Sequence, residues 1–231
     1  MAAASSLRVG GLSAHSSRDW PGQLVATVFA QGCPWACAYC HNPHLQPVRG
    51  SETIAWEDVL AFLRTRQGLL DGVVFSGGEP TLQPALDDAI SDVRDLGFLV
   101  GLHTGGQYPQ RLARILSRVD WVGLDVKAPW EAYERITGVA ASGDAVQESL
   151  ALLVASGVDF EARTTVHPAL LSADELAMIA DELAMAGVRR FALQGFRPQG
   201  CVGDLPAASL TAASLPAGLA DRFEVFELRE S

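Results

Sequence analysis

The chain has 231 residues, of which 48% are hydrophobic and 19% charged, and its formal net charge is −10. This composition is typical of a single globular domain with a substantial core. The acidic balance excludes nucleic acid as a partner, because the phosphates would be repelled. No apolar run approaches the roughly 20 residues that cross a bilayer, so no membrane partner is expected. The first residues lack a basic stretch leading into an apolar one, so no signal peptide is expected and the cytoplasm is the expected location.

Apolar runs bounded by Gly, Asp or Pro predict buried strands, and apolar residues at helical spacing predict the helices between them. In chain order we expect a strand or hairpin with a turn over 7–20, strands over 24–30, 73–75, 98–102, 121–127, 160–166 and 189–193, and helices over 53–70, 82–96, 107–119, 133–138, 145–156 and 172–186. This alternation of strands and helices is the pattern of right-handed parallel βαβ units.

The predicted fold class is therefore α/β. Six repeats are too few for a closed eight-stranded barrel, and they favour a partial, open (β/α)6 parallel barrel. We expect residues 1–22 to form an N-terminal extension, residues 23–200 the core domain, and residues 201–231 a C-terminal tail that packs on the core. Ligands of such folds bind beyond the carboxyl ends of the strands, so the chemistry is expected at that edge.

Three of the four cysteines, Cys33, Cys37 and Cys40, follow the strand predicted over 24–30 with the spacing C-x3-C-x2-C. Clustered cysteines favour a metal site in a reducing compartment over a disulfide framework. Three thiolates can hold three irons of a 4Fe–4S cube, which leaves one iron with open coordination sites. The alternative is a zinc site. Its fourth ligand would be His41, His44, His103 or Cys201, the last of which is otherwise a free thiol.

Two further segments follow predicted strands. In Gly77-Gly78-Glu79-Pro80 the paired glycines allow positive φ and close approach of the backbone to a ligand. A plain turn with an acidic residue at a helix N-terminus is the alternative interpretation. Asp125 and Lys127 end another strand, and because side chains alternate along a strand, they point to the same side. This pair suits a zwitterionic ligand, although a simple salt bridge has the same pattern.

These segments together resemble the radical S-adenosylmethionine (SAM) superfamily, and within it the activating enzymes of glycyl-radical proteins. The resemblance rests on the cysteine spacing, on the G-G-E-P match at 77–80 and on residues 16–22, which read Ser-Ser-Arg-Asp-Trp-Pro-Gly. That segment is similar to the S-x-x-D-(aromatic)-P-G segment of the activating enzymes. The stretch from Leu124 to Gly138 resembles the activator of anaerobic ribonucleotide reductase. The resemblance also implies the partial barrel expected above.

The activity that the resemblance implies is that of a radical SAM oxidoreductase of the formate C-acetyltransferase or anaerobic ribonucleotide reductase activating type. Its cofactors would be SAM and a 4Fe–4S cluster held by Cys33, Cys37 and Cys40. An electron from a flavodoxin- or ferredoxin-type donor would cleave SAM to methionine and a 5′-deoxyadenosyl radical. That radical would take a hydrogen from a glycine of a glycyl-radical enzyme, with anaerobic ribonucleotide reductase as the expected partner.

The resemblance also implies which residues contact SAM. They are Tyr39, Gly77, Gly78, Glu79, Thr104, Asp125, Lys127, Arg163, Gln194 and Phe196. Lys127 is expected to meet the SAM carboxylate. Lys127 and the three cysteines are the expected catalytic residues. An inward arginine such as Arg163 needs an anionic partner, which a carboxylate provides. The chain departs from the family's D-T-N-G pattern, since His103 and Gly105 replace Asp and Asn, and from Q-Q-F-R-P at Gly195.

Two other functions remain open. The first is a radical SAM enzyme that acts on a small molecule, such as the pterin-derived substrate of 7-carboxy-7-deazaguanine synthase, which is also a short radical SAM protein. The stretch from Asp125 to Gly138 favours the activating enzyme over it. The second is a non-catalytic zinc or iron–sulfur binding module, which would not cleave SAM.

Overall fold

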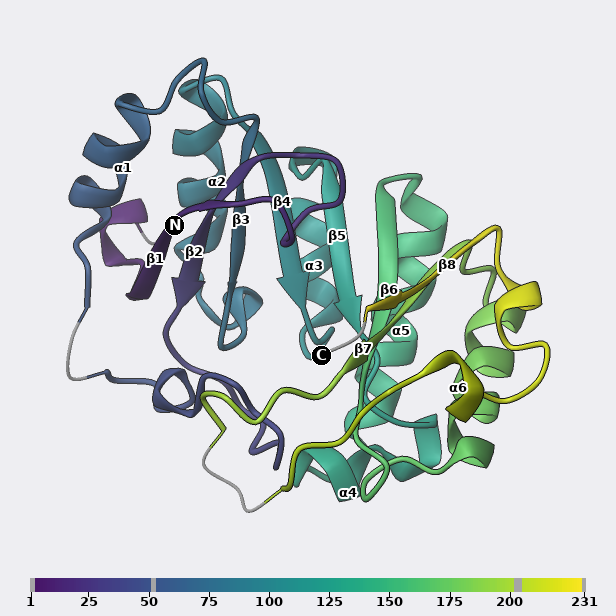
Figure 1. Cartoon of the computed structure of the whole chain (residues 1–231). Coiled ribbons are helices and arrows are strands. Elements are labelled where there is room, and N and C mark those ends of the chain that lie inside the picture. Colours follow the sequence, from purple (N-terminus) through teal and green to yellow (C-terminus); the bar gives the residue numbers. More distant parts are fainter. Residues whose placement is uncertain (1–2, 51–52, 202–204, 230–231) are drawn as a thin grey trace. The chain divides into compact units, whose positions relative to one another are not determined.

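The computed structural model describes residues 3–50, 53–201 and 205–229. Its strands follow chain order, β1 to β8, in an eight-stranded sheet (Figure 1). The chain divides into two compact units. The first unit contains Met1–Pro34, His44–Thr104 and Gln110–Gly123, and the second contains Trp35–Pro43, Gly105–Pro109 and Leu124–Ser231.

The parallel strands of the first unit end at one edge, and the strand before them runs in the opposite direction. They are β1 (Val9–Ser16), β2 (Val25–Ala30), β3 (Gly72–Gly77) and β4 (Leu99–Thr104). β1 runs antiparallel to β2, whereas β2, β3 and β4 are parallel neighbours. In the β2–β3 ladder Val25 pairs with Gly72 and Ala30 with Gly77, so these two strands finish level with each other.

Helices α1 (Trp56–Arg64), α2 (Leu86–Asp95) and α3 (Pro109–Ile115) follow β2, β3 and β4. α1 buries Trp56, Val59 and Leu63, which lie on one face at helical spacing. The Trp56 indole N–H donates to the Asp92 carboxylate on α2 at 2.8 Å. Each helix thus covers the sheet with an apolar face, and its polar face remains outside.

A tryptophan pair fills the interior of the first unit. Trp20 and Trp121 stack with ring centroids 5.6 Å apart, in a cluster with Val25 and Val74. A Cβ at Gly101 would lie 2.8 Å from the Trp20 ring, so only glycine leaves room for it. The segment before β2 is therefore anchored inside the unit.

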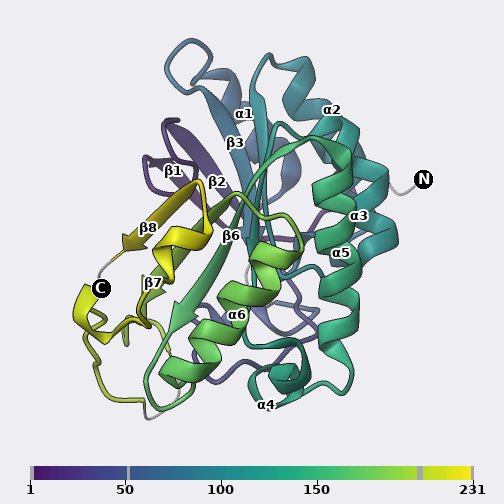
Figure 2. The ribbon, with the colours of Figure 1, turned by 90° about the vertical axis from the view of Figure 1, so that its right-hand side faces the viewer.

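The second unit continues the alternation. β5 (Trp121–Asp125) begins in the first unit and ends in the second, and β6 (Asp159–Val166), β7 (Arg190–Gly195) and β8 (Val225–Arg229) are successive parallel neighbours. Helices α4 (Tyr133–Thr137), α5 (Ser142–Ser156) and α6 (Ala173–Met185) belong to this unit. α5 and α6 pack along the same side of its sheet (Figure 2).

Local chemistry explains where these helices begin and end. α6 has a capping box, in which the Ser172 side chain accepts from the Glu175 N–H and the Glu175 side chain accepts from the Ser172 N–H. α5 ends at Gly157, whose φ of +74° is a left-handed conformation that favours glycine. These signals are local, which is why the sequence predicts both helices.

The expected α/β class with an open, mostly parallel sheet is confirmed, and each strand predicted between 24 and 193 is present. Within the described residues the structure adds β8, in the stretch expected to be a tail. Val225 to Arg229 pairs with Arg190 to Gln194 of β7. The assignment of 1–22, 23–200 and 201–231 as extension, core and tail stays a prediction.

The helices of residues 3–50, 53–201 and 205–229 differ from membrane-spanning helices in length and hydropathy. None of them is both long enough and apolar enough to span a membrane.

Candidate active site

The turn after β3 lies directly against the backbone that leads into the cysteine loop. Gly77 has a φ of +104°, the Gly78 N–H donates to the Ala30 carbonyl at 2.9 Å, and the Glu79 N–H donates to the Gly32 carbonyl at 2.8 Å. A Cβ at Gly78 would lie 2.3 Å from the Gly32 oxygen. Both glycines are therefore needed for the backbone path of this turn, whatever ligand the turn meets.

The Glu79 carboxylate is fully buried and joins two of the predicted site residues. It accepts a hydrogen bond from the Thr104 hydroxyl at 2.8 Å, from the Thr81 N–H at 3.0 Å, and from the Thr81 hydroxyl. Glu79 also caps the short 3-10 helix Pro80–Leu82. The capping role considered from sequence is thus present, and it brings Glu79 and Thr104 together at the carboxyl edge of β3 and β4.

Cys33 belongs to the first unit and is held by its backbone. Its N–H donates to the Gln46 carbonyl at 2.9 Å, next to a bond from the Gly32 N–H to the Leu45 carbonyl at 2.7 Å. The Gln31 amide donates to the His44 carbonyl at 3.0 Å. Residues 31–33 are thereby fixed to residues 44–46, so the start of the cysteine loop has a defined position in this unit.

Cys37 and Cys40 belong to the second unit. The Cys40 N–H donates to the Cys37 carbonyl at 3.1 Å, which closes a tight turn, and the Ala36 N–H donates to the Thr137 carbonyl at 3.0 Å. Burial raises the pKa of the Cys37 thiol, although the nearby Lys127 ammonium acts in the opposite direction. Both thiols are half-buried and free of disulfides.

The charged residues predicted at the end of β5 and within β6 meet in the second unit. Arg163 donates to Asp125 Oδ1 from Nε at 3.1 Å and from an NH2 nitrogen at 2.8 Å. Lys127 Nζ lies 3.7 Å from Asp125 Oδ2. The expectation that Asp125 and Lys127 point to the same side is confirmed, and Asp125 bridges the two cations.

Aromatic rings surround the Lys127 ammonium. Its nitrogen lies 5.5 Å from the Tyr39 ring centroid and 5.9 Å from that of Trp35. The backbone N–H of Lys127 donates to the Tyr133 hydroxyl at 2.9 Å. Burial opposes the charge on Lys127, but the facing Tyr39, Asp125 and Cys37 groups outweigh it and raise the pKa of the ammonium well above its usual range. Lys127 is therefore cationic at neutral pH.

The Tyr39 hydroxyl is buried, and within the described residues it has no hydrogen-bond partner. Burial raises the pKa of Tyr39, so the group stays a neutral phenol. A buried donor without a partner costs about 1–3 kcal/mol, which a ligand that accepts its hydrogen bond would recover. Tyr39 is thus suited to contact a ligand beside Lys127.

His103 is held by two groups of the first unit. One ring nitrogen, Nε2, lies 2.6 Å from the Asp19 carbonyl oxygen, and because a carbonyl only accepts, Nε2 carries the hydrogen. Nδ1 lies 3.1 Å from the Ser76 hydroxyl. The Asp19 carboxylate in turn accepts from the Thr27 hydroxyl at 2.5 Å. The histidine that replaces the family's aspartate therefore anchors the segment before β2.

Gly105, the other departure from the family pattern, has a steric cause. A Cβ there would lie 2.6 Å from the Trp35 ring and about as close to the Gln107 amide, at 2.9 Å. The asparagine expected at this position could not fit beside Trp35. The sequence reasoning missed Trp35, although an aromatic residue inside a cysteine loop was the available signal.

The end of β7 carries two predicted contacts. Gln194 is half-buried on the strand, and Phe196 is buried just beyond it. The Phe196 ring stacks on the His41 imidazole at 5.8 Å and meets His167 edge-on at 5.1 Å. Neither histidine was predicted as a contact of Phe196.

The three motif cysteines suit an iron–sulfur cluster chemically, since all are partly exposed thiols on one loop and none of these three forms a disulfide. The thiolate is the form that binds iron, and at Cys37 the Lys127 ammonium only partly offsets burial, which disfavours that form. Over residues 3–50, 53–201 and 205–229, no group of three or more His, Cys, Asp or Glu side chains is arranged to hold a metal ion. The cluster assignment therefore rests on the donor set and on the relatives given below.

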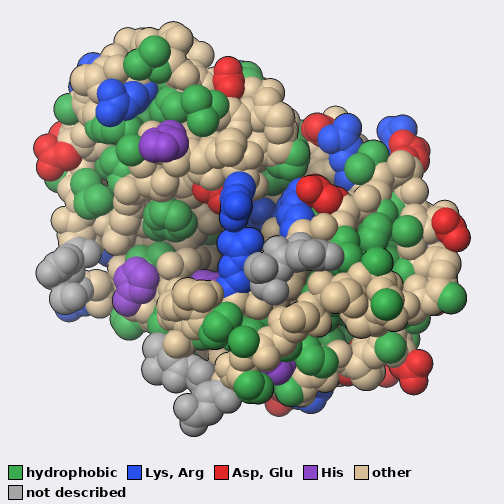
Figure 3. All heavy atoms as spheres, in the orientation of Figure 1, with side chains coloured by type: hydrophobic (Ala, Val, Ile, Leu, Met, Phe, Trp, Pro, Cys, Tyr) green, Lys and Arg blue, Asp and Glu red, His purple; other side chains and the backbone are tan. Residues whose placement is uncertain are grey.

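Charge on the surface is unevenly distributed. In the space-filling view, Lys and Arg side chains gather near the middle of one face, with acidic side chains beside them (Figure 3).

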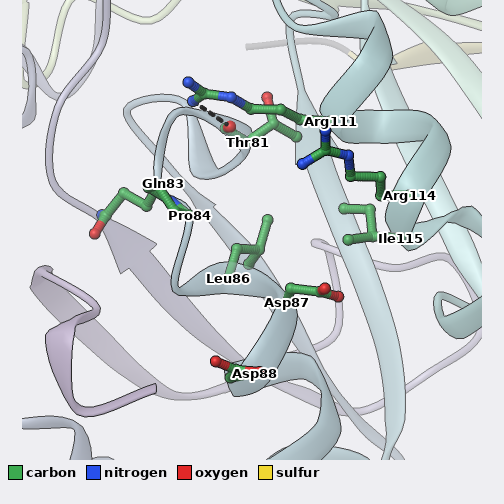
Figure 4. Close-up of a pocket in the computed structure, with 9 residues that line it drawn as sticks. All are labelled: Thr81, Gln83, Pro84, Leu86, Asp87, Asp88, Arg111, Arg114 and Ile115. Atoms are coloured by element: carbon green, nitrogen blue, oxygen red, sulfur yellow. Dashed lines mark hydrogen bonds between the residues drawn. The ribbon is translucent and has the colours of Figure 1, made fainter. Parts of the chain in front are cut away.

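A separate cavity of about 310 Å³ lies in the first unit, where the start of α2 faces α3 (Figure 4). Its lining residues are Thr81, Gln83, Pro84, Leu86, Asp87, Asp88, Arg111, Arg114 and Ile115. None of the predicted site residues is among them. Arg111 donates to the Thr81 and Leu82 carbonyls, so it fastens the turn after β3 to α3.

Comparison with known proteins identifies the family. The family described as "Radical SAM superfamily" matches residues 27–171. A protein of Methanocaldococcus jannaschii, named as a glycyl-radical enzyme activating enzyme, is 28% identical over 83% of this chain and 80% of its own length. The pyruvate formate-lyase-activating enzyme of Clostridium pasteurianum is 31% identical over 73% and 72%. The 7-carboxy-7-deazaguanine synthase of Methanopyrus kandleri is 33% identical over 51% and 55%.

Solved structures share the fold. QueE from Escherichia coli has a TM-score of 0.57 at 17% identity, and the match covers 95% of this chain and 92% of the QueE chain. Streptococcus suis SuiB bound to S-adenosylmethionine has a TM-score of 0.63 at 15% identity, and the match covers 77% of this chain but 41% of SuiB. The partial barrel is therefore confirmed, and the family match decides for the iron–sulfur cluster over zinc. The chain belongs to the radical SAM superfamily, whose members use a 4Fe–4S cluster and SAM.

Proposed function

We propose that this chain is a cytoplasmic activating enzyme that generates a glycyl radical on a partner enzyme, anaerobic ribonucleotide reductase. The observation that carries the proposal is the pair of relatives named as activating enzymes, which match over 80% and 72% of their own lengths. The resemblance of residues 124–138 to the reductase activator supports the choice of partner. A flavodoxin- or ferredoxin-type protein is the proposed electron donor.

Different residues of the chain have different proposed roles in this reaction. Cys33, Cys37 and Cys40 would hold three irons and leave the fourth open. When bound, the reduced cluster and SAM supply the radical that abstracts hydrogen from the partner's glycine. The chain itself orients SAM and keeps water from the reacting atoms.

In the second unit, Lys127 and Arg163 are the proposed partners of the SAM carboxylate. Arg163 is buried and Lys127 is half-buried, and both lie beside the Asp125 carboxylate, so this pair of cations suits a carboxylate ligand. The Tyr39 hydroxyl, buried without a partner among the described residues, is the proposed neighbouring contact. Gln194 and Phe196 stay proposed adenosine contacts.

In the first unit, Gly77, Gly78, Glu79 and Thr104 are proposed to form the edge that receives the SAM amino group. The Glu79 carboxylate is oriented by the hydroxyls of Thr81 and Thr104, so its position does not depend on the ligand. The two glycines contribute by allowing the tight backbone path of this turn, which places Glu79 at the edge.

The test begins with anaerobic reconstitution of the cluster and reduction in the presence of SAM. Formation of 5′-deoxyadenosine is expected, and Cys37→Ala should abolish it. Addition of an anaerobic ribonucleotide reductase from the same source should then produce a glycyl doublet in the electron paramagnetic resonance spectrum. Cleavage of SAM without a doublet on that enzyme would reject the partner, and absence of cleavage would reject the activity.

A small-molecule radical enzyme is the second candidate, because a 7-carboxy-7-deazaguanine synthase is 33% identical over about half of this chain. It predicts turnover of a pterin-derived substrate to a deazapurine without any protein partner. Product analysis by mass spectrometry after incubation with that substrate separates the two. A binding module that does not cleave SAM is excluded by the same 5′-deoxyadenosine measurement.

A further inference from the structure

The turn after β7, residues 196–201, lies against the end of the cysteine loop. The His41 imidazole Nε2 is 3.0 Å from the Arg197 carbonyl oxygen, to which it donates. The Cys201 thiol donates to the Tyr39 carbonyl at 3.4 Å. All of these residues belong to the second unit. The chain on either side of Cys40 is therefore tied to a turn far away in sequence.

Gly200 makes this close approach possible. Its φ is +88°, and a Cβ there would lie 2.4 Å from the His41 carbonyl oxygen. The Cys201 N–H donates to the Pro198 carbonyl at 3.2 Å and closes the turn. Any residue larger than glycine would have to move either this turn or the residue that follows Cys40.

Aromatic contacts extend the attachment. Phe196 is buried, and its ring stacks on His41 with an interplanar angle of 24°. On the other side, His167 meets Phe196 edge-on, and its Nε2 donates to the Pro206 carbonyl at 2.9 Å. His167 Nδ1 accepts from the Ala169 N–H at 3.1 Å, which fixes its tautomer. His41 thus stacks on the Phe196 ring, and His167, which also contacts that ring, is itself held by hydrogen bonds.

We propose that His41, Phe196 and Gly200, together the loop clasp, are positioning residues that hold the Cys37–Cys40 turn in the conformation that retains the cluster. A loop that is already ordered binds its cofactor more tightly, because the cost of ordering is removed before binding. The clasp acts on the loop backbone and ring packing, so none of its members is a ligand. It gives Phe196 a role in supporting the loop in addition to the proposed adenosine contact.

The test measures cluster retention rather than activity. Gly200→Ala and the full-length parent protein are reconstituted anaerobically, and the loss of iron–sulfur absorbance is followed after addition of an iron chelator. Gly200→Ala is expected to lose its cluster about tenfold faster, which is the scale of outer-shell effects on metal affinity. Gly157→Ala is the matched control, because Gly157 also has positive φ, at +74°, but no atom within 4 Å of an added Cβ.

Substitutions of His41 separate the two kinds of contact. His41→Phe keeps the ring on Phe196 and loses the donor, His41→Gln keeps a donor and loses the ring, and His41→Ala loses both. We expect the fastest cluster loss in His41→Ala and intermediate rates in the other two. Gln199→Ala, in the same turn but exposed, should behave as the parent protein does.

Urea unfolding of the cluster-free proteins distinguishes a loop effect from a fold effect. Faster cluster loss with an unchanged unfolding midpoint supports the clasp. Retention equal to the parent in both Gly200→Ala and His41→Ala would overturn it. Equal acceleration in Gly157→Ala, or lowered midpoints in all the His41 variants, would also overturn it, since the residues would then stabilise the fold in general.

Discussion

The two units form their carboxyl edges in different ways. In the first unit, the turn at Gly77 and Gly78 is packed against backbone atoms, and the Glu79 carboxylate is held by hydroxyl and N–H donors. In the second unit, Asp125 joins two buried or partly buried cations, Lys127 and Arg163. We call these the backbone edge and the charge edge.

The difference teaches which changes each edge tolerates. A close-packed backbone contact has no room for an added methyl group, yet it responds little to salt or pH. Charge pairs tolerate small changes in shape, but they depend on the charge of each partner and on screening. Substitutions that add volume should therefore destabilise the backbone edge, and substitutions that remove a charge should destabilise the charge edge.

The largest effect is expected from Gly78→Ala. The added Cβ would lie 2.3 Å from the Gly32 oxygen and 3.0 Å from the Leu45 oxygen, and both are backbone atoms that cannot rotate away. We expect the free energy of unfolding to fall by about 3 kcal/mol, measured by urea denaturation. Gly11→Ala is the control, since its Cβ would meet the Phe29 ring at an ordinary 3.5 Å. Equal stability of the two variants would contradict a backbone edge.

Asp125→Asn tests the charge edge. The Arg163 side chain is only 7% exposed and would lose its ion pair with Asp125, whereas Asp125 itself is 36% exposed and partly screened. We therefore expect a loss of about 2 kcal/mol, between the values for exposed and buried pairs, and a smaller loss at high salt. Glu224→Gln, which breaks an exposed pair with Arg189, should leave stability unchanged. A salt-independent effect of Asp125→Asn would argue against electrostatics as its cause.

His103→Asp introduces the family's acid into the first unit. It removes the contacts with the Asp19 carbonyl and the Ser76 hydroxyl and places a carboxylate near a carbonyl oxygen. A loss of about 1.5 kcal/mol is expected from the unfolding curve. His103→Gln keeps a donor that can reach Asp19 and should recover most of this loss. If His103→Asp were as stable as the parent protein, the proposed role of His103 in anchoring the segment before β2 would be wrong.

The smallest effect concerns Glu182, which accepts from the Trp130 N–H at 3.2 Å just after the charge edge. Burial raises the pKa of this carboxyl despite that hydrogen bond, so the folded state keeps the proton to higher pH than the unfolded state does. The contribution of Glu182 to stability is therefore fully present below its pKa in the unfolded state, and it is lost as pH rises through its pKa in the folded state. We expect a fall of about 0.3 kcal/mol after screening, absent in Glu182→Gln, in unfolding measurements across mildly acidic pH.

Glu175 is the control of opposite sign. The Ser172 N–H, aided by the Ser172 side chain and Arg135, lowers the pKa of this carboxyl, so its stabilisation is present above its unfolded pKa and is lost as pH falls. Glu175→Gln should therefore remove a loss of stability on the acid side. If stability depended on pH in the same way in Glu182→Gln and Glu175→Gln, neither carboxyl would be the cause of that dependence.

Much of the fold and of the site was predictable because its signals are local. The spacing of Cys33, Cys37 and Cys40, the turn at 77–80 and the alternation that places Asp125 beside Lys127 each lie within a few residues. The strand β8 was missed because its pairing partner, β7, lies across a long irregular stretch. No short-range pattern marks a strand whose ladder is formed so far away.

The sequence by itself determined the family, the fold class and the candidate cluster ligands, since each depends on residue types at short, fixed spacing. Only the tertiary structure decided what His103 and His41 do, because their hydrogen-bond partners lie 84 and 156 residues away in the chain. It likewise decided why position 105 is glycine, since the Trp35 ring occupies the space. Steric room and hydrogen-bond partners of this kind exist only once distant segments have packed together.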